Sequence, residues 1–153
     1  MSYDPPYIWK KFANGFGSAA IVNLTTIANN LGQNEILENY SGHGFRSQGY
    51  IESVPEVGYD SWKIAAKKGL EYAFSLIETN WTVTINSIEG RAVTDTNPTI
   101  VGYTVMRAFF DKIDFHLSSD QIAVLEEFVI SSWNKPYVEL IPNFYNLTFS
   151  EYY

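Results

Sequence analysis

The segment from Asp60 to Asp114 constrains the fold of this chain more than any other. It contains two apolar stripes at helical spacing, one on each side of a stretch in which apolar and polar residues alternate. Repeats near 3.6 residues indicate amphipathic helices, and alternation of period two indicates a half-buried strand. Helix, strand and helix within one short segment predict an α/β (α+β) fold, built as a two-layer sandwich in which helices cover a sheet.

The first predicted helix starts at Asp60, whose carboxylate we expect to cap it, and ends near Asn80. The predicted strand follows at once, with apolar residues alternating along 81–85. Glu89-Gly90 then predicts a turn into a second strand at 91–93. The segment therefore predicts a hairpin between two helices.

Three further features refine this segment and its sequel. Ile88 breaks the alternation of the predicted strand, which indicates a β-bulge. Asn97 before Pro98 predicts the start of a second helix, and its apolar residues cover so much of its circumference that we expect it to be the most buried. Ser118 and Gln121 match a capping box, which predicts a third helix that stops before Pro136.

The flanking segments carry weaker patterns. We expect residues 1–17 to form an N-terminal arm, and apolar residues at helical spacing predict an added N-terminal helix from Ser18 to Leu31. Strand-rich compositions at 35–40 and 45–54 predict a hairpin. Near the C-terminus, 137–141 has strand character and precedes an aromatic tail, residues 143–153.

Length and composition limit the classes of function. A chain of 153 residues predicts a single domain, residues 1–153. The formal net charge of -7 disfavours nucleic acid as a partner, because phosphate backbones are repelled. The absence of cysteine excludes thiolate nucleophiles and cysteine-ligated metals, and two distant histidines make no metal site, so we expect no metal and no cofactor. Without a signal peptide or a long apolar segment, we expect a cytoplasmic protein without a membrane partner.

One family has a similar order of elements. The residues that carry the likeness are Lys68-Gly69-Leu70-Glu71, Trp81-Thr82-Val83-Thr84-Ile85 and Asp95-Thr96-Asn97-Pro98. On these residues, the segment from Tyr59 to Ile113 resembles domain IV of elongation factor G and of ribosomal-protection proteins. In that family, a helix that ends near a Lys/Gln-Gly step is followed by a strand with alternating valines, a hairpin, an Asp-Ser or Asp-Thr step and a second helix. The resemblance implies a ribosomal S5 domain 2-like or related sandwich and a role linked to translation.

The Gly-rich segment at His43 is one candidate site. His43 lies between two glycines and close to Arg46, where an imidazole and a guanidinium on an exposed loop could bind an anion or act as an acid/base pair. The alternative is a hairpin loop whose histidine is only solvated, and we favour it because turn motifs indicate function loosely.

Carboxylates and tail aromatics are the other candidates. Sequence proximity alone does not make Glu52 or the Glu126-Glu127 pair catalytic, so we expect these carboxylates on solvated faces. Aromatic residues at a chain end either complete the core or contact a partner. Core completion is the more common outcome, and Tyr145, Phe149 and Tyr153 are the residues that would bind a partner if the tail is exposed.

These observations favour a non-catalytic domain that binds another protein. One version is an immunity-type inhibitor, because a small acidic domain suits a basic partner. A second version, implied by the resemblance, is a translation-linked domain. The alternative is a small hydrolase or isomerase that uses His43 with a carboxylate, which requires the two groups within hydrogen-bond reach.

Overall fold

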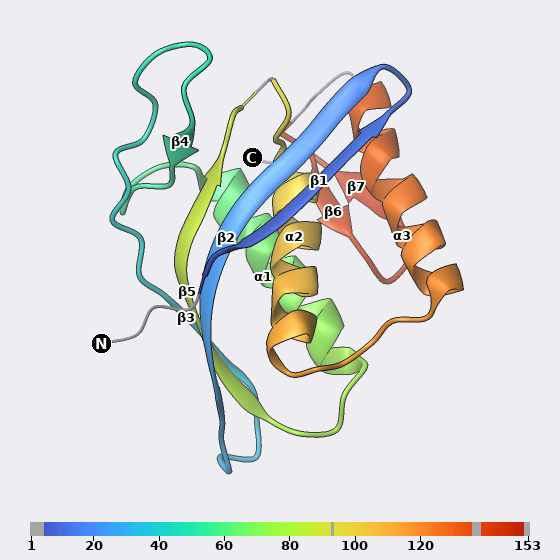
Figure 1. The fold of residues 1–153 in the computed structure, drawn as a ribbon. Coiled ribbons are helices and arrows are strands. Elements are labelled where there is room, and N and C mark those ends of the chain that lie inside the picture. Colours follow the sequence, from blue (N-terminus) through green and yellow to red (C-terminus); the bar gives the residue numbers. More distant parts are fainter. Residues whose placement is uncertain (1–4, 93, 136–138, 152–153) are drawn as a thin grey trace.

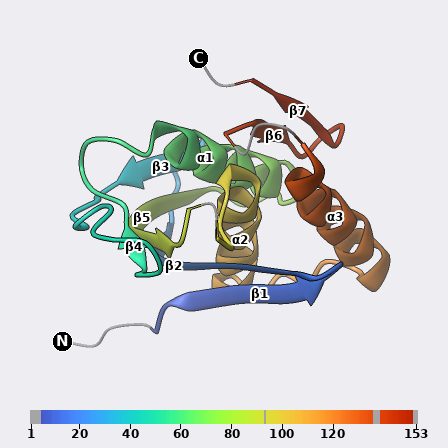
Figure 2. The same ribbon diagram turned by 90° about the horizontal axis from the view of Figure 1, so that it is seen from above.

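The computed structural model describes residues 5–92, 94–135 and 139–151, and they form an α+β fold with a mixed sheet. The helices lie on one side of the sheet, and the sheet curves around α2 (Figures 1 and 2). The elements in chain order are β1 (Tyr7–Ala13), β2 (Phe16–Ala28), β3 (Glu35–Glu38), β4 (Glu52–Ser53), α1 (Asp60–Ser75), β5 (Trp81–Gly90), α2 (Pro98–Lys112), α3 (Ser119–Ser131), a 3-10 turn (Ser132–Asn134), β6 (Ile141–Asn143) and β7 (Thr148–Ser150).

The sheet has the strand order β1-β2-β5-β3, and β4 also pairs with β5. Neighbouring strands are antiparallel except for β3 and β5, which are parallel. A parallel pair needs a crossover connection, and α1 lies within that connection. The strands β6 and β7 form a separate antiparallel hairpin near α1 and α2.

The helix α2 lies between the sheet and α1, because it contacts both β2 and α1, as Figure 2 shows.

Residues 7–28 form the strands β1 and β2, so the prediction of a helix from Ser18 to Leu31 is wrong, and the segment expected as an arm contains β1. Residues 7–13 of β1 pair with residues 16–22 of β2 around a two-residue turn at Asn14 and Gly15. Both turn residues have positive φ, 56° and 80°, the conformation of a type I′ turn. Along β2, alternate residues are buried from Ser18 onward, which is the period of a strand.

The long strand β5 replaces the predicted hairpin between the helices. It runs without a turn through Glu89 to Gly90, and Ala92 makes only an isolated bridge to Thr96, while Val93 lies outside the described residues. The predicted bulge is confirmed, because the register with β2 shifts between Asn23 and Leu24. Because of this shift, the buried side of β5 changes from odd-numbered to even-numbered residues after Ile85, so that Ile85 and Ile88 both lie in the core.

The hairpin predicted at 35–54 is also wrong, although both of its strands exist in shorter form. β3 pairs with the first half of β5, whereas β4 pairs with its end. Residues 45–50, between these two strands, are all exposed and form a loop. The predicted strand at 137–141 reduces to the start of β6 at Ile141, and 136–138 lie outside the described residues.

The three predicted helices of the central and C-terminal segments are confirmed. Asn97 caps α2 through its side-chain oxygen, which accepts from the amide of Ile100. Ser118 and Gln121 form the predicted capping box of α3. The cap of α1 differs from the prediction, because Tyr59 occupies the N-cap with a φ of 57° and its side chain makes no capping hydrogen bond to the helix. α2 is the most buried helix, with twelve of its fifteen residues buried.

The helices α1 and α2 meet backbone to backbone at two glycines. A Cβ at Gly69 would collide with the carbonyl oxygen of Gly102. A Cβ at Gly102 would lie 2.6 Å from the carbonyl oxygen of Ala65 and 3.1 Å from the ring of Phe144. Real side chains do not tolerate such distances, so these positions require glycine for contact between the helices.

We expect Gly69→Ala to lower the free energy of unfolding by about 3 kcal/mol or more, because the new methyl group must push α1 and α2 apart. Chemical denaturation at neutral pH measures the change. Gly17→Ala is the control, because its Cβ would meet only the Phe12 ring at 3.9 Å, and its effect should stay within about 0.5 kcal/mol. Equal stability of Gly69→Ala and the native protein would contradict the contact.

Candidate functional site

The helix α3 forms the outer side of the molecule and is the centre of the candidate site (Figure 1). Leu125, Phe128 and Val129 face the core, whereas Asp120 and Val124 are exposed. Leu117, immediately before the capping box, is buried in the same core. α3 is therefore a ridge with one face anchored and the other face open to a partner.

The carboxylate of Glu126 anchors α3 to β1 and α2. Its Oε1 accepts a hydrogen bond from Lys11 Nζ at 2.9 Å, and its Oε2 accepts from Trp9 Nε1 at 3.2 Å and from the Tyr103 hydroxyl at 2.9 Å. Arg107 Nη1 lies 3.4 Å from the same Oε2 and donates to the Tyr103 hydroxyl at 2.8 Å. The Glu126 side chain is only 13% exposed, so the expectation of a solvated face is wrong for this residue.

These contacts hold Glu126 in its ionised form. Burial alone would raise its pKa, but the hydrogen bonds from Lys11, Tyr103 and Trp9 outweigh burial and keep the pKa below its usual range. The pKa of Tyr103 is raised, chiefly by burial, so its hydroxyl remains a donor at neutral pH. A carboxylate with this many donors is a poor proton acceptor, and Glu126 is suited to positioning rather than to acid/base chemistry.

A groove lies between α3 and the β6–β7 hairpin and has a volume of about 290 Å³. We call it the α3 groove, and its lining residues are Tyr72, Asp120, Gln121, Val124, Leu125, Phe144, Tyr145 and Leu147. Val124 is 52% exposed and Tyr145 is 62% exposed. The ring of Tyr145 packs edge-on against Tyr72, with the ring centres 5.3 Å apart. The groove is thus preformed, with an exposed apolar side chain on each side.

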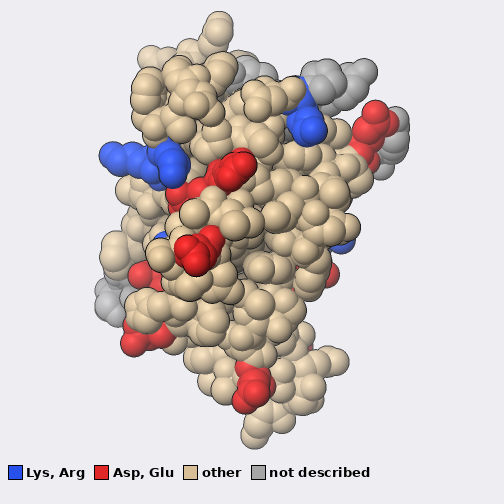
Figure 3. Space-filling view, turned by 90° about the vertical axis from the view of Figure 1, so that its right-hand side faces the viewer, with Lys and Arg blue, Asp and Glu red and all other residues tan. Residues whose placement is uncertain are grey.

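A second hollow, of about 440 Å³, lies between the β1–β2 turn and the opposite side of α3. Lys11, Asn14, Glu127 and Ile130 are among its lining residues. Figure 3 views the α3 side of the molecule, which is largely uncharged. Separate acidic side chains lie across its middle, toward its lower end and at its upper right, and basic ones lie toward its upper part. The exposed residues Asp120 and Glu127 give the α3 ridge an acidic character.

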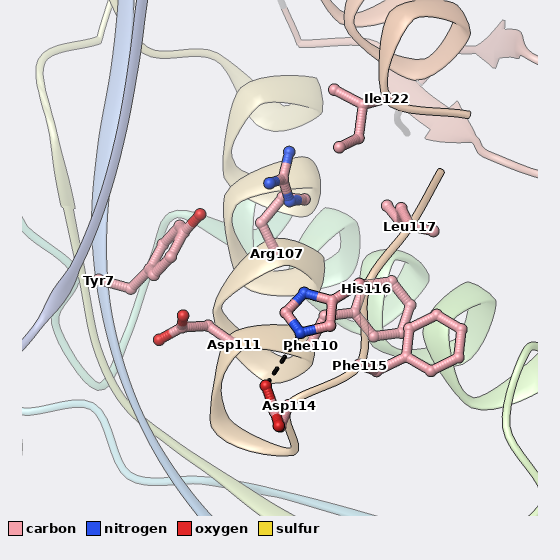
Figure 4. A pocket seen from close by; sticks show the side chains of 9 residues that line it. All are labelled: Tyr7, Arg107, Phe110, Asp111, Asp114, Phe115, His116, Leu117 and Ile122. Atoms are coloured by element: carbon pink, nitrogen blue, oxygen red, sulfur yellow. Dashed lines mark ion pairs between the residues drawn. The ribbon is translucent and has the colours of Figure 1, made fainter. Parts of the chain in front are cut away.

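A smaller pocket, of about 120 Å³, lies at the C-terminal half of α2 (Figure 4). We call it the α2 pocket, and its lining residues are Tyr7, Arg107, Phe110, Asp111, Asp114, Phe115, His116, Leu117 and Ile122. His116 Nε2 lies 3.0 Å from Asp114 Oδ1, and both side chains are largely exposed. No residue of the α2 pocket lines the α3 groove, so the two sites are separate.

The predicted pair His43 and Arg46 lies on the far loop, away from α3. Both side chains are exposed, and His43 Nδ1 is 2.7 Å from the carbonyl oxygen of Gly44. Within the described chain, no carboxylate is bonded to His43. The base of the loop is held by backbone bonds from Gly42 to Val54 and from Gly44 to Ser53. The structure thus does not bring this pair together with the predicted tail residues.

The predicted tail residues divide into three outcomes. Tyr145 borders the α3 groove and donates from its hydroxyl to the carbonyl oxygen of Glu71 at 3.2 Å. Phe149 in β7 is partly buried and stacks on Phe128, with ring centres 4.6 Å apart, so it completes the core. Tyr153 lies outside the described residues.

Sequence reasoning missed the charged residues in the interior. Glu52 is 5% exposed and accepts from the Tyr59 hydroxyl at 2.6 Å and from the amide of Ala92 at 2.8 Å, so its predicted solvated face is wrong. The contact between Arg107 and Glu126 was equally unpredictable from the sequence. Their one signal in the sequence is a charge next to an otherwise apolar helix stripe, which does not identify a partner 19 residues away.

Comparison with protein-family models, with curated proteins and with solved structures gives no significant match. The resemblance to domain IV of elongation factor G therefore stays a prediction. No group of three or more metal-ligating side chains occurs among the described residues. Over the same residues, no helix has both the length and the apolar character needed to cross a bilayer.

We expect Glu126→Gln to lower the free energy of unfolding at pH 7 by about 1–3 kcal/mol, because Lys11 and Arg107 lose their negatively charged partner and one acceptor oxygen becomes an amide NH2 group. Since the pKa of Glu126 is depressed in the folded state, its stabilisation is present above the unfolded carboxyl pKa of about 4.3. It is lost as the pH falls through the lower folded value. The native protein and the variant should therefore converge in acid, as urea denaturation at several pH values would show.

Glu127→Gln is the matched control, because Glu127 is the next residue and is exposed. Its effect should remain within about 0.5 kcal/mol. We call Glu126 and its partners Lys11, Trp9, Tyr103 and Arg107 the Glu126 cluster. A loss of stability that is equal in the two variants, or independent of pH for Glu126→Gln, would show that this cluster does not anchor α3.

Proposed function

We propose that this protein is a non-catalytic domain that binds a basic partner protein through the α3 groove and the adjoining α3 ridge. The observation that carries the proposal is the exposure of Val124 and Tyr145 on the two sides of a preformed groove. Large contiguous apolar patches are rare on monomeric proteins, and those that occur frequently mark interaction sites. Tyrosine is also enriched at interfaces because it combines a large apolar ring with a hydroxyl group.

Charge supports the choice of a basic partner. The chain has a net charge of -7, and Asp120 and Glu127 are exposed beside the apolar surface. An apolar centre with a charged rim is the usual organisation of an interface, and complementary charge raises the association rate and excludes wrong partners. An immunity-type inhibitor of a basic protein is one form that this function takes.

The preformed groove also keeps the cost of binding low. Tyr145 is held by Tyr72 and by the carbonyl oxygen of Glu71, and Glu126 holds α3 in place. Side chains that are already ordered lose less conformational entropy on binding. A surface of this kind binds a partner without rearrangement.

A translation-linked role is a second version of the same function. It rests on the resemblance of the segment from Tyr59 to Ile113 to domain IV of elongation factor G, and it carries with it the S5 domain 2-like fold. The enzyme alternative requires a carboxylate near His43. The described contacts of His43 include only a backbone carbonyl, so the geometry favours binding over catalysis.

We expect the double variant Val124→Ser, Tyr145→Ser to lose a partner that the native protein captures from the lysate of its own cells, because the apolar side chains bordering the groove are removed. Affinity capture followed by mass spectrometry makes the measurement. The captured protein should be basic, and its retention should weaken as salt is raised.

The control is the double variant Ile27→Ser, Leu37→Ser. These residues lie on the sheet and are similarly exposed, at 61% and 50%, against 52% and 62% for Val124 and Tyr145. The control should keep the partner. The proposal fails if the control loses the partner while the groove variant keeps it, or if an acidic protein is the one captured.

A further inference from the structure

The α2 pocket holds opposite charges that are not paired with each other. Arg107 and Asp111 are four residues apart on α2, a spacing at which such side chains commonly form an ion pair. No ion pair joins them in the described part of the chain. Figure 4 shows the guanidinium of Arg107 directed toward Ile122, while the carboxylate of Asp111 points to the side of Tyr7. A cation and an anion thus face the same small cavity separately.

The Glu126 cluster explains why Arg107 does not turn toward Asp111. Arg107 Nη1 is held by the Tyr103 hydroxyl at 2.8 Å, and the guanidinium lies over the Tyr103 ring, 5.7 Å from its centre. Because Lys11 already forms the shorter ion pair with Glu126, the three groups Lys11, Arg107 and Glu126 together carry one positive charge in excess. That charge is available to an anion in the pocket.

We propose that the α2 pocket binds a small α-amino acid, with the carboxylate of the ligand at Arg107 and its ammonium group at Asp111. A zwitterion with adjacent charges matches a site that presents a guanidinium and a carboxylate on one face of a helix. Arginine is the side chain best suited to hold a carboxylate, through parallel hydrogen bonds. Neither a simple anion nor a simple cation satisfies both groups.

The other walls of the pocket fit the same ligand. The hydroxyl group of Tyr7 lies between the two charges in Figure 4 and can donate to a carboxylate or accept from an ammonium group. Burial, opposed in part by Arg107 and reinforced by Asp111 and Glu126, raises the pKa of Tyr7, so the hydroxyl keeps its proton at neutral pH. Leu117 and Ile122 provide apolar wall for a short side chain.

The volume of the pocket limits the size of the ligand. A cavity of about 150 Å³ accommodates benzene, which has about six non-hydrogen atoms. The α2 pocket, at about 120 Å³, therefore accommodates a molecule the size of glycine or alanine. Larger amino acids fit only if their side chains extend into solvent past His116, which is exposed at the rim.

The test compares three probes of similar carbon skeleton with the full chain: L-alanine, ethylamine without the carboxylate, and propionate without the ammonium group. Each is titrated to about 50 mM, above the millimolar affinity expected for so small a ligand, while amide NMR signals are followed. We expect L-alanine to shift the signals of Tyr7, Asp111 and His116 in a saturable way. Ethylamine and propionate should bind at least about ten-fold more weakly.

Asp111→Asn tests the site from the side of the protein. Asp111 takes no part in the Glu126 cluster, so the variant should fold normally and bind L-alanine at least about ten-fold more weakly. Glu56→Gln removes the same charge from an exposed position outside the pocket and should leave binding unchanged. Absence of saturable shifts with L-alanine, equal binding of all three probes, or an equal loss in both variants would overturn the proposal.

Discussion

The backbone contact between α1 and α2 is the constraint on which the other layers depend. Because Gly69 and Gly102 have no side chains, the two helices approach until carbonyl oxygen meets α-carbon. This approach lets α2 lie between α1 and the sheet, where nearly all of its surface is buried. It also leaves the space into which the Phe144 ring packs. The β6–β7 hairpin, and with it one wall of the α3 groove, is thus positioned by two glycines.

The third helix is held in a different way. α3 buries only Leu125, Phe128 and Val129 fully, so apolar burial does little to fix its direction. The bonds of Glu126 to Lys11, Trp9 and Tyr103 come from two other elements and make up for this. Glu126 thus ties α3 to β1 and α2, and its contact with Arg107 helps to keep that guanidinium apart from Asp111 in the α2 pocket. The interior polar cluster and the surface sites are parts of one arrangement.

The sequence predicts the helices of this fold well because their ends carry chemical signals. Asn97 before Pro98 and the Ser118–Gln121 capping box satisfy backbone groups that a helix leaves unpaired, so their meaning is local. The N-terminal hairpin was missed although its signal is present. Asn14-Gly15 is a strong signal for a two-residue hairpin turn. However, Ala20 and Leu24, which are at helical spacing, both lie on the buried face of the strand β2. Their spacing alone therefore cannot distinguish a helix from a strand.

The candidate sites were less predictable because they depend on distant residues. Exposed aromatic residues of the tail pointed to Tyr145, which does border the α3 groove. Nothing local distinguishes Glu126 from Glu127, yet one is enclosed by donors and the other is solvated. The order of the strands β1-β2-β5-β3 follows from pairing across the chain, which periodicity does not encode.

The pairing of β2 with β5 also sets the timing of folding, because Asn86 of β5 is bonded to Asn23 of β2, 63 residues earlier. At about 5–20 residues per second, a ribosome releases β5 roughly 3–13 s after β2, long after an isolated hairpin can form. During that interval one edge of β2 lacks its neighbour, and the polar residues Asn23, Thr25 and Thr26, which interrupt its apolar run, reduce the tendency of that edge to pair with other chains.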